Sequence, residues 1–294
     1  MPSFFGRKRQ PERYLAYFFV APALALLLTF RLIPLISGFG LSLTDWNGIA
    51  APIWVGIGNY VELFTTDLVF RATMQNVGVV LLTLPIWVLL PLLLAVMIHF
   101  GVPGGKFFRV AYFLPLVLSS IIIGSMFSVL LRFDGVLNSF LAIFGLRATD
   151  WLGGSNTALL SVVSVAIWAH FGMSILIYLA GLATLPGEVI EAAKIDGANL
   201  WQIITMIIAP IMIPIIQFVT VICTIEILTS MFGLLFVMTG GGPGTSSYMP
   251  EFLIWQQQGE SNRLGYAAAI SLILFLFVGV LGLIQLKVLR RDVS

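Results

Sequence analysis

Long apolar segments constrain this sequence more than any other feature. A helix needs about 20 consecutive, mostly apolar residues to cross a bilayer. The segments that meet this requirement are residues 15–36, 77–100, 110–131, 158–183, 207–238 and 264–286. Their unbroken apolar runs differ from the residue-by-residue alternation of a membrane β-barrel strand. We therefore predict an all-α, polytopic membrane protein with six transmembrane helices.

The composition argues against other classes of protein. Of the 294 residues, 59% are hydrophobic and 10% are charged, whereas about 25% are charged in soluble domains. So many apolar residues would leave large exposed patches on a soluble protein, and a disordered chain would be polar. A net charge of +2 offers almost no electrostatic footprint for nucleic acid. A single cysteine, Cys223, excludes an internal disulfide and a cysteine-clustered metal site.

The fifth segment, residues 207–238, is too long for one straight span. Pro210 and Pro214 lie near its start, and proline interrupts the regular hydrogen bonding of a helix. We therefore expect the proline end of this segment to be kinked or to lie outside the hydrocarbon.

The distribution of Lys and Arg predicts the orientation of the chain. With the N-terminus in the cytoplasm, most of the 15 basic residues lie in cytoplasmic segments, and Arg31 lies in or near the external end of the first span. This arrangement follows the positive-inside rule. The first apolar run is longer than the h-region of a signal peptide, so it is interpreted as an uncleaved span. We predict cytoplasmic tails at 1–14 and 289–294 and one transmembrane domain at 15–288.

The cytoplasmic segment between the fourth and fifth spans carries the functional signal. Its sequence from Leu185 is LPGEVIEAAKIDGANL. Pro186 suits a first helical position, Glu188 lies where the helix dipole favours negative charge, and Gly197 can end the helix in a left-handed conformation. A second helix can restart near Asn199. This pattern predicts a short, exposed helix–turn–helix that docks on a cytoplasmic partner.

The same segment resembles a known motif. Glu191-Ala192-Ala193, then Gly197, Ile207 and Ala209-Pro210, is similar to the EAA loop of ABC importer permeases. Ala209 departs from the family pattern, which usually has Leu-Pro at the edge of the motif.

Three further motifs extend the resemblance across nearly the whole chain. Residues 55–60 (VGIGNY), 107–109 (FFR) with Leu114-Pro115, and Phe232 with 239–243 (TGGGP) resemble segments of carbohydrate-uptake permeases of the maltose-transporter type. The last motif resembles the signature of one of the two partner permeases in that family. The motifs occur in the family's order and on the expected sides of the membrane.

The resemblance implies a type I ABC importer transmembrane domain in a bacterial or archaeal cytoplasmic membrane. It implies three kinds of protein partner: a second EAA-containing permease, two copies of a cytoplasmic ATPase, and an extracytoplasmic solute-binding protein. Residues 184–206 would form a coupling loop that docks in a groove of the ATPase. The coupling residues would be Glu188, Glu191, Ala192, Ala193, Lys194, Asp196 and Gly197.

The sequence predicts no ATP site and no catalytic residue on this chain. A Walker A loop reads G-x-x-x-x-G-K-[ST], but Gly105-Lys106 is followed by Phe107, and Phe100 stands where the first glycine would be. ATP and Mg²⁺ are expected on the partner ATPase. We predict no cofactor and no metal ligands here.

The resemblance also implies where a sugar would sit, near mid-membrane between the fourth and fifth spans. An aromatic platform with hydrogen-bonding groups suits the apolar faces and hydroxyl rim of a sugar. The expected substrate-facing residues are Trp168, His170, Met173, Thr224, Glu226, Ile227 and Leu228.

Two of these residues have structural alternatives. Glu226 is the only acidic residue inside a predicted span, and such a group is either a paired residue at a helix interface or a functional one. His170 is either an interhelical hydrogen-bonding contact or a substrate contact. Metal binding is not predicted, because the only other histidine, His99, lies near the opposite turn.

Other functions remain open from the sequence. Within the importer class, a glycerol-phosphate-type or other polar solute is an alternative to a sugar, although the spans lack a mid-membrane Lys or Arg for an anion. An ion-coupled secondary transporter would need paired intramembrane charges, and only Glu226 is available. A membrane enzyme would need a cluster of catalytic side chains, which two distant histidines do not supply.

Overall fold

The computed structural model describes residues 10–101 and 105–290. The structure is mostly helical, as predicted. Its elements are α1 (Gln10–Leu27), the π-helix η1 (Leu28–Leu32), α2 (Ile33–Leu41), β1 (Thr44–Asp45), β2 (Ile53–Trp54), α3 (Gly58–Thr65), α4 (Leu68–Leu81), α5 (Leu84–His99), α6 (Gly105–Val117), α7 (Ser120–Leu130), α8 (Val136–Ile143), α9 (Ala158–Leu182), α10 (Gly187–Ile195), α11 (Leu200–Gln202), the π-helix η2 (Ile203–Ile208), α12 (Ala209–Thr229), α13 (Phe232–Met238), α14 (Pro250–Gly259) and α15 (Leu264–Arg290).

Five helical segments within the described residues are long and apolar enough to cross a membrane. They are Tyr17–Leu41, Leu68–His99, Ala158–Leu182, Ile203–Thr229 and Leu264–Lys287. A sixth span is formed only if the bent pair of α6 and α7 counts as one. The predicted cytoplasmic tails, 1–14 and 289–294, lie largely outside the described residues.

The core of the bundle is built on α9. This helix packs against α5, α6 and α12, and α12 in turn packs against α15. Apolar residues occur on all sides of α9, and more than half of its central window is buried. Gly172 lies so close to the backbone carbonyl of Tyr112 on α6 that a Cβ would have no room. Small residues allow such close helix contacts in membranes, where packing drives association.

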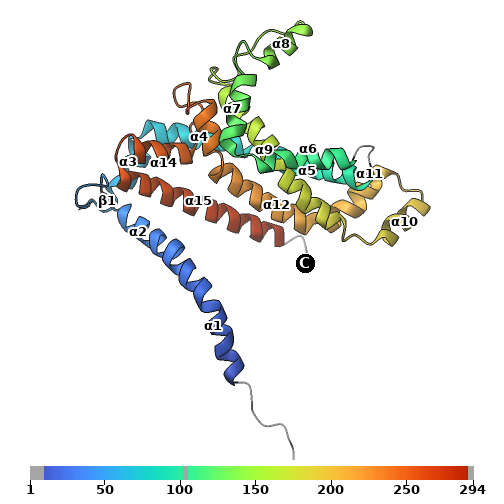
Figure 1. Ribbon diagram of the computed structural model, residues 1–294, viewed down its shortest axis with the longest axis horizontal. Coiled ribbons are helices and arrows are strands. Elements are labelled where there is room, and N and C mark those ends of the chain that lie inside the picture. The colour runs from blue at the N-terminus through green and yellow to red at the C-terminus, as the bar shows by residue number, and fades with distance from the viewer. Residues whose placement is uncertain (1–9, 102–104, 291–294) are drawn as a thin grey trace, which may run out of the picture.

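The bundle has two distinct ends, which Figure 1 shows at its left and right. The hairpin end carries the short antiparallel pair of β1 and β2, in which Thr44 faces Trp54, together with α3 and α14. The opposite end carries α10 and α11 (Figure 1). We refer to these as the hairpin end and the α10 end.

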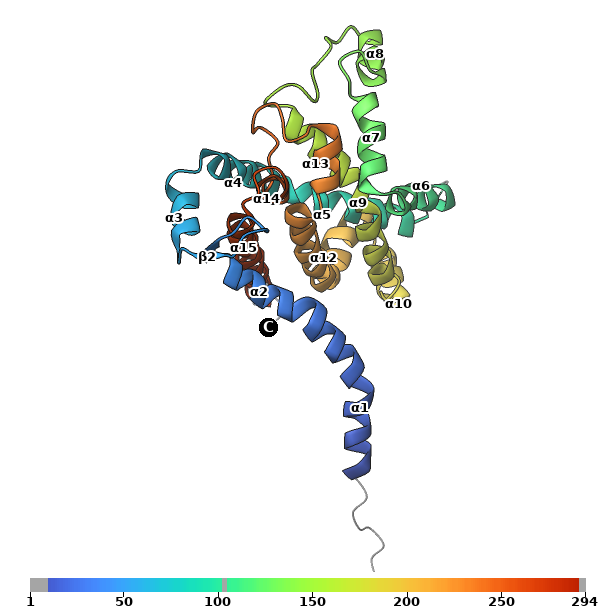
Figure 2. The same cartoon turned by 60° about the vertical axis from the view of Figure 1, so that its left-hand side comes forward.

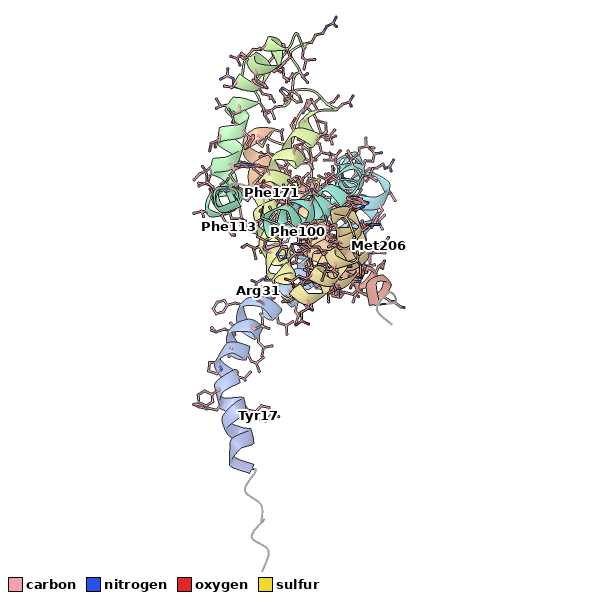
Figure 3. All side chains as sticks on the ribbon, turned by 90° about the vertical axis from the view of Figure 1, so that its right-hand side faces the viewer. Tyr17, Arg31, Phe100, Phe113, Phe171 and Met206 are labelled. Carbon is pink, nitrogen blue, oxygen red and sulfur yellow. The ribbon has the colours of Figure 1, made fainter. Side chains whose placement is uncertain are left out.

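The first span leaves the bundle. Figures 1 and 2 show that α1 diverges from the other helices after α2 packs against α15. In the most apolar window of Tyr17–Leu41 no residue is buried. Tyr17 and Arg31 mark this separated helix in Figure 3. Arg31 lies in the π-helical turn Leu28–Leu32, within the helical segment Tyr17–Leu41.

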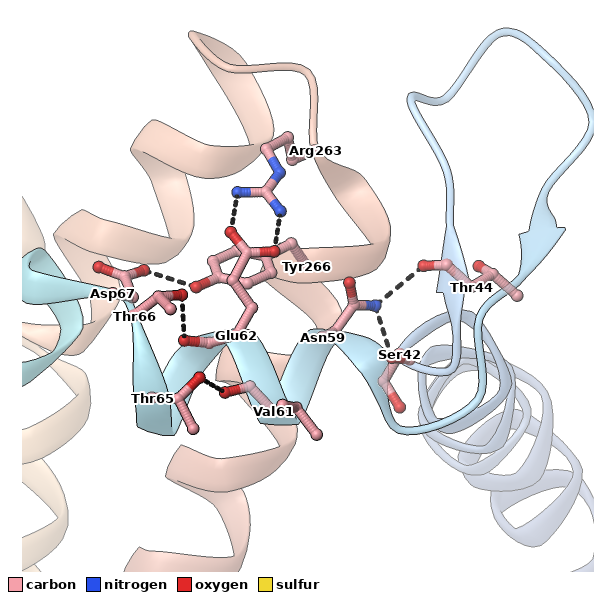
Figure 4. A network of polar contacts seen from close by, with 10 residues as sticks. All are labelled: Ser42, Thr44, Asn59, Val61, Glu62, Thr65, Thr66, Asp67, Arg263 and Tyr266. Carbon is pink, nitrogen blue, oxygen red and sulfur yellow. Dashed lines mark hydrogen bonds and ion pairs between the residues drawn. The ribbon is translucent and has the colours of Figure 1, made fainter.

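Polar contacts fasten the base of that first span to the bundle (Figure 4). Asn59 on α3 donates from Nδ2 to the carbonyls of Ser42 and Thr44, at 2.8 and 3.0 Å. Arg263 makes two hydrogen bonds to the carboxylate of Glu62, at 2.9 and 2.7 Å. The bidentate pair and the amide therefore tie α2, α3 and the start of α15 together at the hairpin end.

The third predicted span, 110–131, is not one straight helix. Its two halves, 111–117 and Ser120–Leu130, meet at an angle of 115°. Ser119 at the break has an extended ψ of 148°, and its side chain caps α7 by accepting from the backbone N–H of Ile122. The break redirects α7 away from the bundle, where α7 and α8 project to one side (Figure 1).

The fifth predicted span, 207–238, is not one straight helix, as its length led us to expect. Helix α12 is continuous through Pro210 and Pro214, and the π-helix η2 directly precedes it; prolines and π-helical turns are both common causes of a bend in a helix. The helix breaks at Ser230, whose φ of −136° ends α12. The residues beyond it form α13, which packs against α7.

Candidate functional site

The segment expected to dock on a partner forms an exposed helix at the α10 end of the bundle. Helix α10 contains no buried residue. Pro186 is its N-cap, with an extended ψ of 117°, and the helix begins at Gly187, one residue later than the sequence suggested. Ile190 and Ala193 are partly buried against the core, so one side of α10 rests on the bundle and the other side is open.

The turn after α10 has the geometry expected from Gly197. This residue has a φ of +81°, a conformation that L-residues with a Cβ rarely adopt. The N–H of Gly197 donates to Lys194 O at 3.1 Å, and the N–H of Ala198 donates to Ala193 O at 2.9 Å. These two bonds form a Schellman motif. The prediction of a left-handed helix end is confirmed.

The restart of the helix after this turn is capped on both sides. The N–H of Gln202 donates to Asn199 Oδ1 at 2.9 Å, while the N–H of Asn199 donates to Gln202 Oε1 at 2.8 Å. This reciprocal pair is a capping box, and it fixes the entry into η2 and α12. The conformation of the loop is therefore set by local sequence and links α10 directly to the fifth span.

The open side of this segment is mainly polar. The exposed residues among the seven expected coupling residues are Glu188, Glu191, Ala192, Lys194, Asp196 and Gly197, while Ala193 is half-buried. Ile195 is 86% exposed. This isoleucine lies next to the expected coupling residues without being one of them, and a second apolar side chain of the same helix, Val189, is also exposed.

The fourth span does not bring its three candidate residues together. Residues two apart on a helix point in directions about 200° apart, so Trp168 and His170 lie on opposite sides of α9. Trp168 packs edge-on against Phe127 of α7, with ring centroids 5.2 Å apart. Met173, which is 46% exposed, lies nearer to His170 around the helix. The expected platform of Trp168 with His170 is therefore not formed.

His170 instead takes part in a small cluster between three spans. Its Nδ1 lies 2.9 Å from Ala166 O, and its ring centroid lies 5.9 Å from that of Trp87 on α5. Glu226 on α12 interacts electrostatically with His170. Trp87 Nε1 is buried and has no hydrogen-bond partner among the described residues. The cluster therefore joins two predicted residues with a tryptophan that sequence reasoning missed.

The remaining candidates on the fifth span are packed in the core. Thr224, Ile227 and Leu228 are at most 2% exposed. Thr224 accepts a hydrogen bond from Gln285 Nε2 on α15 at 2.7 Å. In this conformation these three side chains stabilise the helix packing and do not line an open cavity.

Two cavities open on the hairpin half of the bundle. One of about 400 Å³ is lined by Trp168, Trp151 and Ser161 together with residues of α7 and α8. The other, of about 670 Å³, lies between α12, α13, α14 and α15 and is lined by residues that include Phe232, Glu251 and Trp255. Both cavities are mostly apolar with a few polar groups. Within the described residues, no group of three or more His, Cys, Asp or Glu side chains is placed to hold a metal ion.

These features define an all-α polytopic membrane protein with an exposed helix, α10, at one end of its bundle. Residues 48–294 match the family described as "Binding-protein-dependent transport system inner membrane component". The chain belongs to this family.

Curated relatives and solved structures agree with that assignment. The chain is 31% identical to the multiple sugar-binding transport system permease protein MsmF of Streptococcus mutans, covering 95% of this chain and 97% of that protein. It is 27% identical to the trehalose/maltose transport system permease protein MalF of Thermococcus litoralis, with 96% of each chain covered. A crystal structure of a bacterial ABC transporter involved in the import of the acidic polysaccharide alginate has a chain that matches with a TM-score of 0.83 at 25% identity, covering 96% of both chains.

Proposed function

We propose that this chain is the permease subunit of an ATP-driven importer that moves a sugar or an oligosaccharide into the cytoplasm. The relatives named above are permeases of multiple-sugar and trehalose/maltose transport systems, and they match along nearly the full length of this chain. The spans α9 and α12 carry no Lys or Arg, which favours a neutral solute over a phosphorylated one. The proposed cycle is alternating access, with ATP bound and hydrolysed on a separate subunit.

The observation that carries this proposal is the exposed, capped segment α10. A soluble ATPase can drive a membrane protein through a rigid contact, and α10 is a short helix whose C-terminus is fixed by a Schellman motif, while the capping box fixes the start of the helix that follows it. Its exposed carboxylates, Glu188 and Glu191, and its exposed Ile195 would contact a groove of the ATPase. Displacement of α10 would be passed directly to η2 and α12.

The proposed solute contacts follow from which candidates face the same way. His170, Met173 and Glu226 are the best placed, because His170 and Glu226 interact and Met173 is exposed beside them. Trp168 would contact solute only from its separate cavity. Thr224, Ile227 and Leu228 would become contacts only if α12 moved relative to α15.

The other proposed partners account for surfaces that this chain leaves open. The first span is apolar and has no buried residue in its central window, so a second permease subunit would pack against α1. A solute-binding protein would dock at the hairpin end, and two ATPase copies would bind the α10 ends of the two permeases. Both termini and residues 184–206 would be cytoplasmic.

Affinity purification of the tagged chain from native membranes tests the proposal. We expect a second permease and an ATPase to co-purify, and ATP hydrolysis by the reconstituted complex to rise when the solute-binding protein and one member of a panel of mono- and disaccharides are added. Co-purification without any ATPase would contradict the importer. Stimulation by an anionic oligosaccharide alone would contradict the neutral solute.

A further inference from the structure

The break between α12 and α13 is held by one side chain from a distant helix. Glu251, the second residue of α14, accepts hydrogen bonds through Oε2 from the backbone N–H groups of Met231 and Phe232, at 3.0 and 2.8 Å. The first N–H groups of a helix have no partner inside the helix. Met231, the N-cap residue, provides no side-chain cap of its own. Glu251 therefore supplies the cap that the local sequence lacks.

This cap fixes more than one short helix. Helix α13 packs tightly against α7, because a Cβ on Gly233 would come within 3.1 Å of Ser120 Cβ on α7. Gly124 of α7 also faces the backbone of α13, where its Cβ would be in van der Waals contact with Leu234 Cα at 3.6 Å. The two half-helices beyond the breaks at Ser119 and Ser230 thus form one unit, and Glu251 joins this unit to α14.

We propose that Glu251 is a positioning residue for transport: its carboxylate holds the α7–α13 unit against the end of α12, and its charge state sets how firmly this unit is held. An ionised carboxylate makes stronger hydrogen bonds to N–H groups than a neutral one, and negative charge at a helix start is stabilising. The unit lies at the hairpin half of the bundle, where a solute would enter, so a loosened cap would slow the conformational cycle.

The environment of Glu251 places this charge change in an accessible range of pH. Burial raises the pKa of Glu251 to about 7, and the two backbone N–H bonds oppose that rise only in part. The titratable and charged groups on and beside the elements packed against α14 are Asp67 and Arg71 of α4, Cys223 and Glu226 of α12, Arg263, Tyr266, Lys287 and Arg290 at or in α15, and Tyr248 and Glu260 at the ends of α14 itself. Helix α13 carries none.

The sign of the pH effect follows from this shift. Below about pH 7 the carboxyl is protonated and the cap is weak, and above about pH 7 it is ionised and the cap is strong. Glu251→Gln keeps an oxygen acceptor of the same shape but cannot ionise, so it mimics the protonated form at every pH. Glu260→Gln is the matched control, because Glu260 is exposed at the other end of the same helix.

The experiment uses the reconstituted complex in proteoliposomes, with ATP inside at fixed pH and the solute-binding protein outside. ATP hydrolysis stimulated by that protein is measured at external pH 6 to 8. We expect the stimulated rate of the wild type, divided by that of Glu251→Gln, to rise from near one at pH 6 to about fivefold at pH 8, with a midpoint near pH 7. The stimulated rate of the wild type divided by that of Glu260→Gln should be the same at every pH. Because both rates in a ratio are measured at the same pH, the effects of titrating groups on the other subunits cancel. A flat Glu251→Gln ratio would overturn the proposal.

A second measurement needs neither the variant nor transport. Hydrogen exchange of the backbone amides of residues 229–235 in the wild-type complex, corrected for the intrinsic effect of pH, should show greater protection at pH 8 than at pH 6. Equal protection at both values would also overturn the proposal. Because the transport readout rests on the proposed import function and the exchange readout does not, failure of one proposal is distinguishable from failure of the other.

Discussion

Gly197 shows how far single residues can be interpreted from sequence. Its place after a helical run and before Ala198-Asn199 predicted a left-handed helix end, and the structure has a φ of +81° there. The signal is local, because a Schellman motif depends on residues within one turn of the glycine. Asn199 was likewise identified as a restart, and its capping box with Gln202 depends on a spacing of three residues that the sequence displays.

The first prediction concerns this turn. Gly197→Val puts a β-branched side chain where a Cβ costs about 1–2 kcal/mol, so it should misdirect α10. Gly197→Asn is the control, because asparagine tolerates the left-handed region. No atom lies within 4 Å of the position where a Cβ would be, so the difference reports on conformation and not on crowding. We expect Val, but not Asn, to lower co-purification of the ATPase roughly tenfold. Equal recovery from both variants would contradict this.

The sequence did not predict which of the expected substrate-facing residues lie on the same side of a helix, because it does not fix how each helix is rotated in the bundle. The sequence indicates which helix a residue belongs to, but Trp168 and His170 can share a helix and still point in opposite directions. The contacts that decide direction come from other spans: Phe127 for Trp168, Trp87 for His170 and Gln285 for Thr224. None of these pairs is close in sequence.

A second prediction tests the cluster around His170. Glu226→Gln and His170→Gln should each lower the transport rate about tenfold, which corresponds to about 1.4 kcal/mol of barrier, because each removes the electrostatic interaction between these two half-buried side chains. Assembly should be retained. Thr224→Ser is the control, since it keeps the hydroxyl that accepts from Gln285. Uptake of the transported sugar at saturating solute-binding protein is the measurement. Normal rates in both variants would show that this cluster is only structural.

At the scale of elements, the lengths of the apolar segments predicted where the spans lie but not where their helices break. The segment 110–131 is apolar throughout, yet α6 and α7 meet at 115°. The cause is the extended Ser119 and the close packing of α7 on α13, a contact between segments more than 100 residues apart. In the fifth span the length of the apolar segment predicted an interruption, but no proline marks the position of the break at Ser230.

A third prediction concerns the packing of α9 against α6. Gly172→Ala should destabilise the protein by about 1–3 kcal/mol, because the added methyl group meets backbone and overpacking is costly. Gly279→Ala is the control, since it lies in a spanning helix with nothing within 4 Å of its Cβ position. Thermal unfolding of the two purified variants is the measurement. A melting temperature equally close to that of the wild type in both would contradict the tight contact.

At the scale of the whole molecule, the structure explains why the positive-inside pattern is a useful guide. Helices α10 and α14 lie at opposite ends of the bundle (Figure 1), so fixing the side of one fixes the side of the other. Basic residues alone set which end faces the cytoplasm. The first span adds little to this geometry by packing, since no residue of its most apolar window is buried, and it meets the bundle through α2 on α15 and through the contacts of its base with α3 (Figure 4).

The last prediction is therefore topological. In a Cys223→Ser background, which removes the native thiol, a buried residue, Glu260→Cys should react with a membrane-impermeant maleimide in intact cells. Lys194→Cys should react only after the membrane is opened. Both positions are exposed, so a lack of labelling reports on the side of the membrane and not on burial. Labelling of Lys194→Cys from outside would show that the topology is inverted. Helix α10 would then be external and could not contact a cytoplasmic ATPase, so this result would contradict the importer proposal.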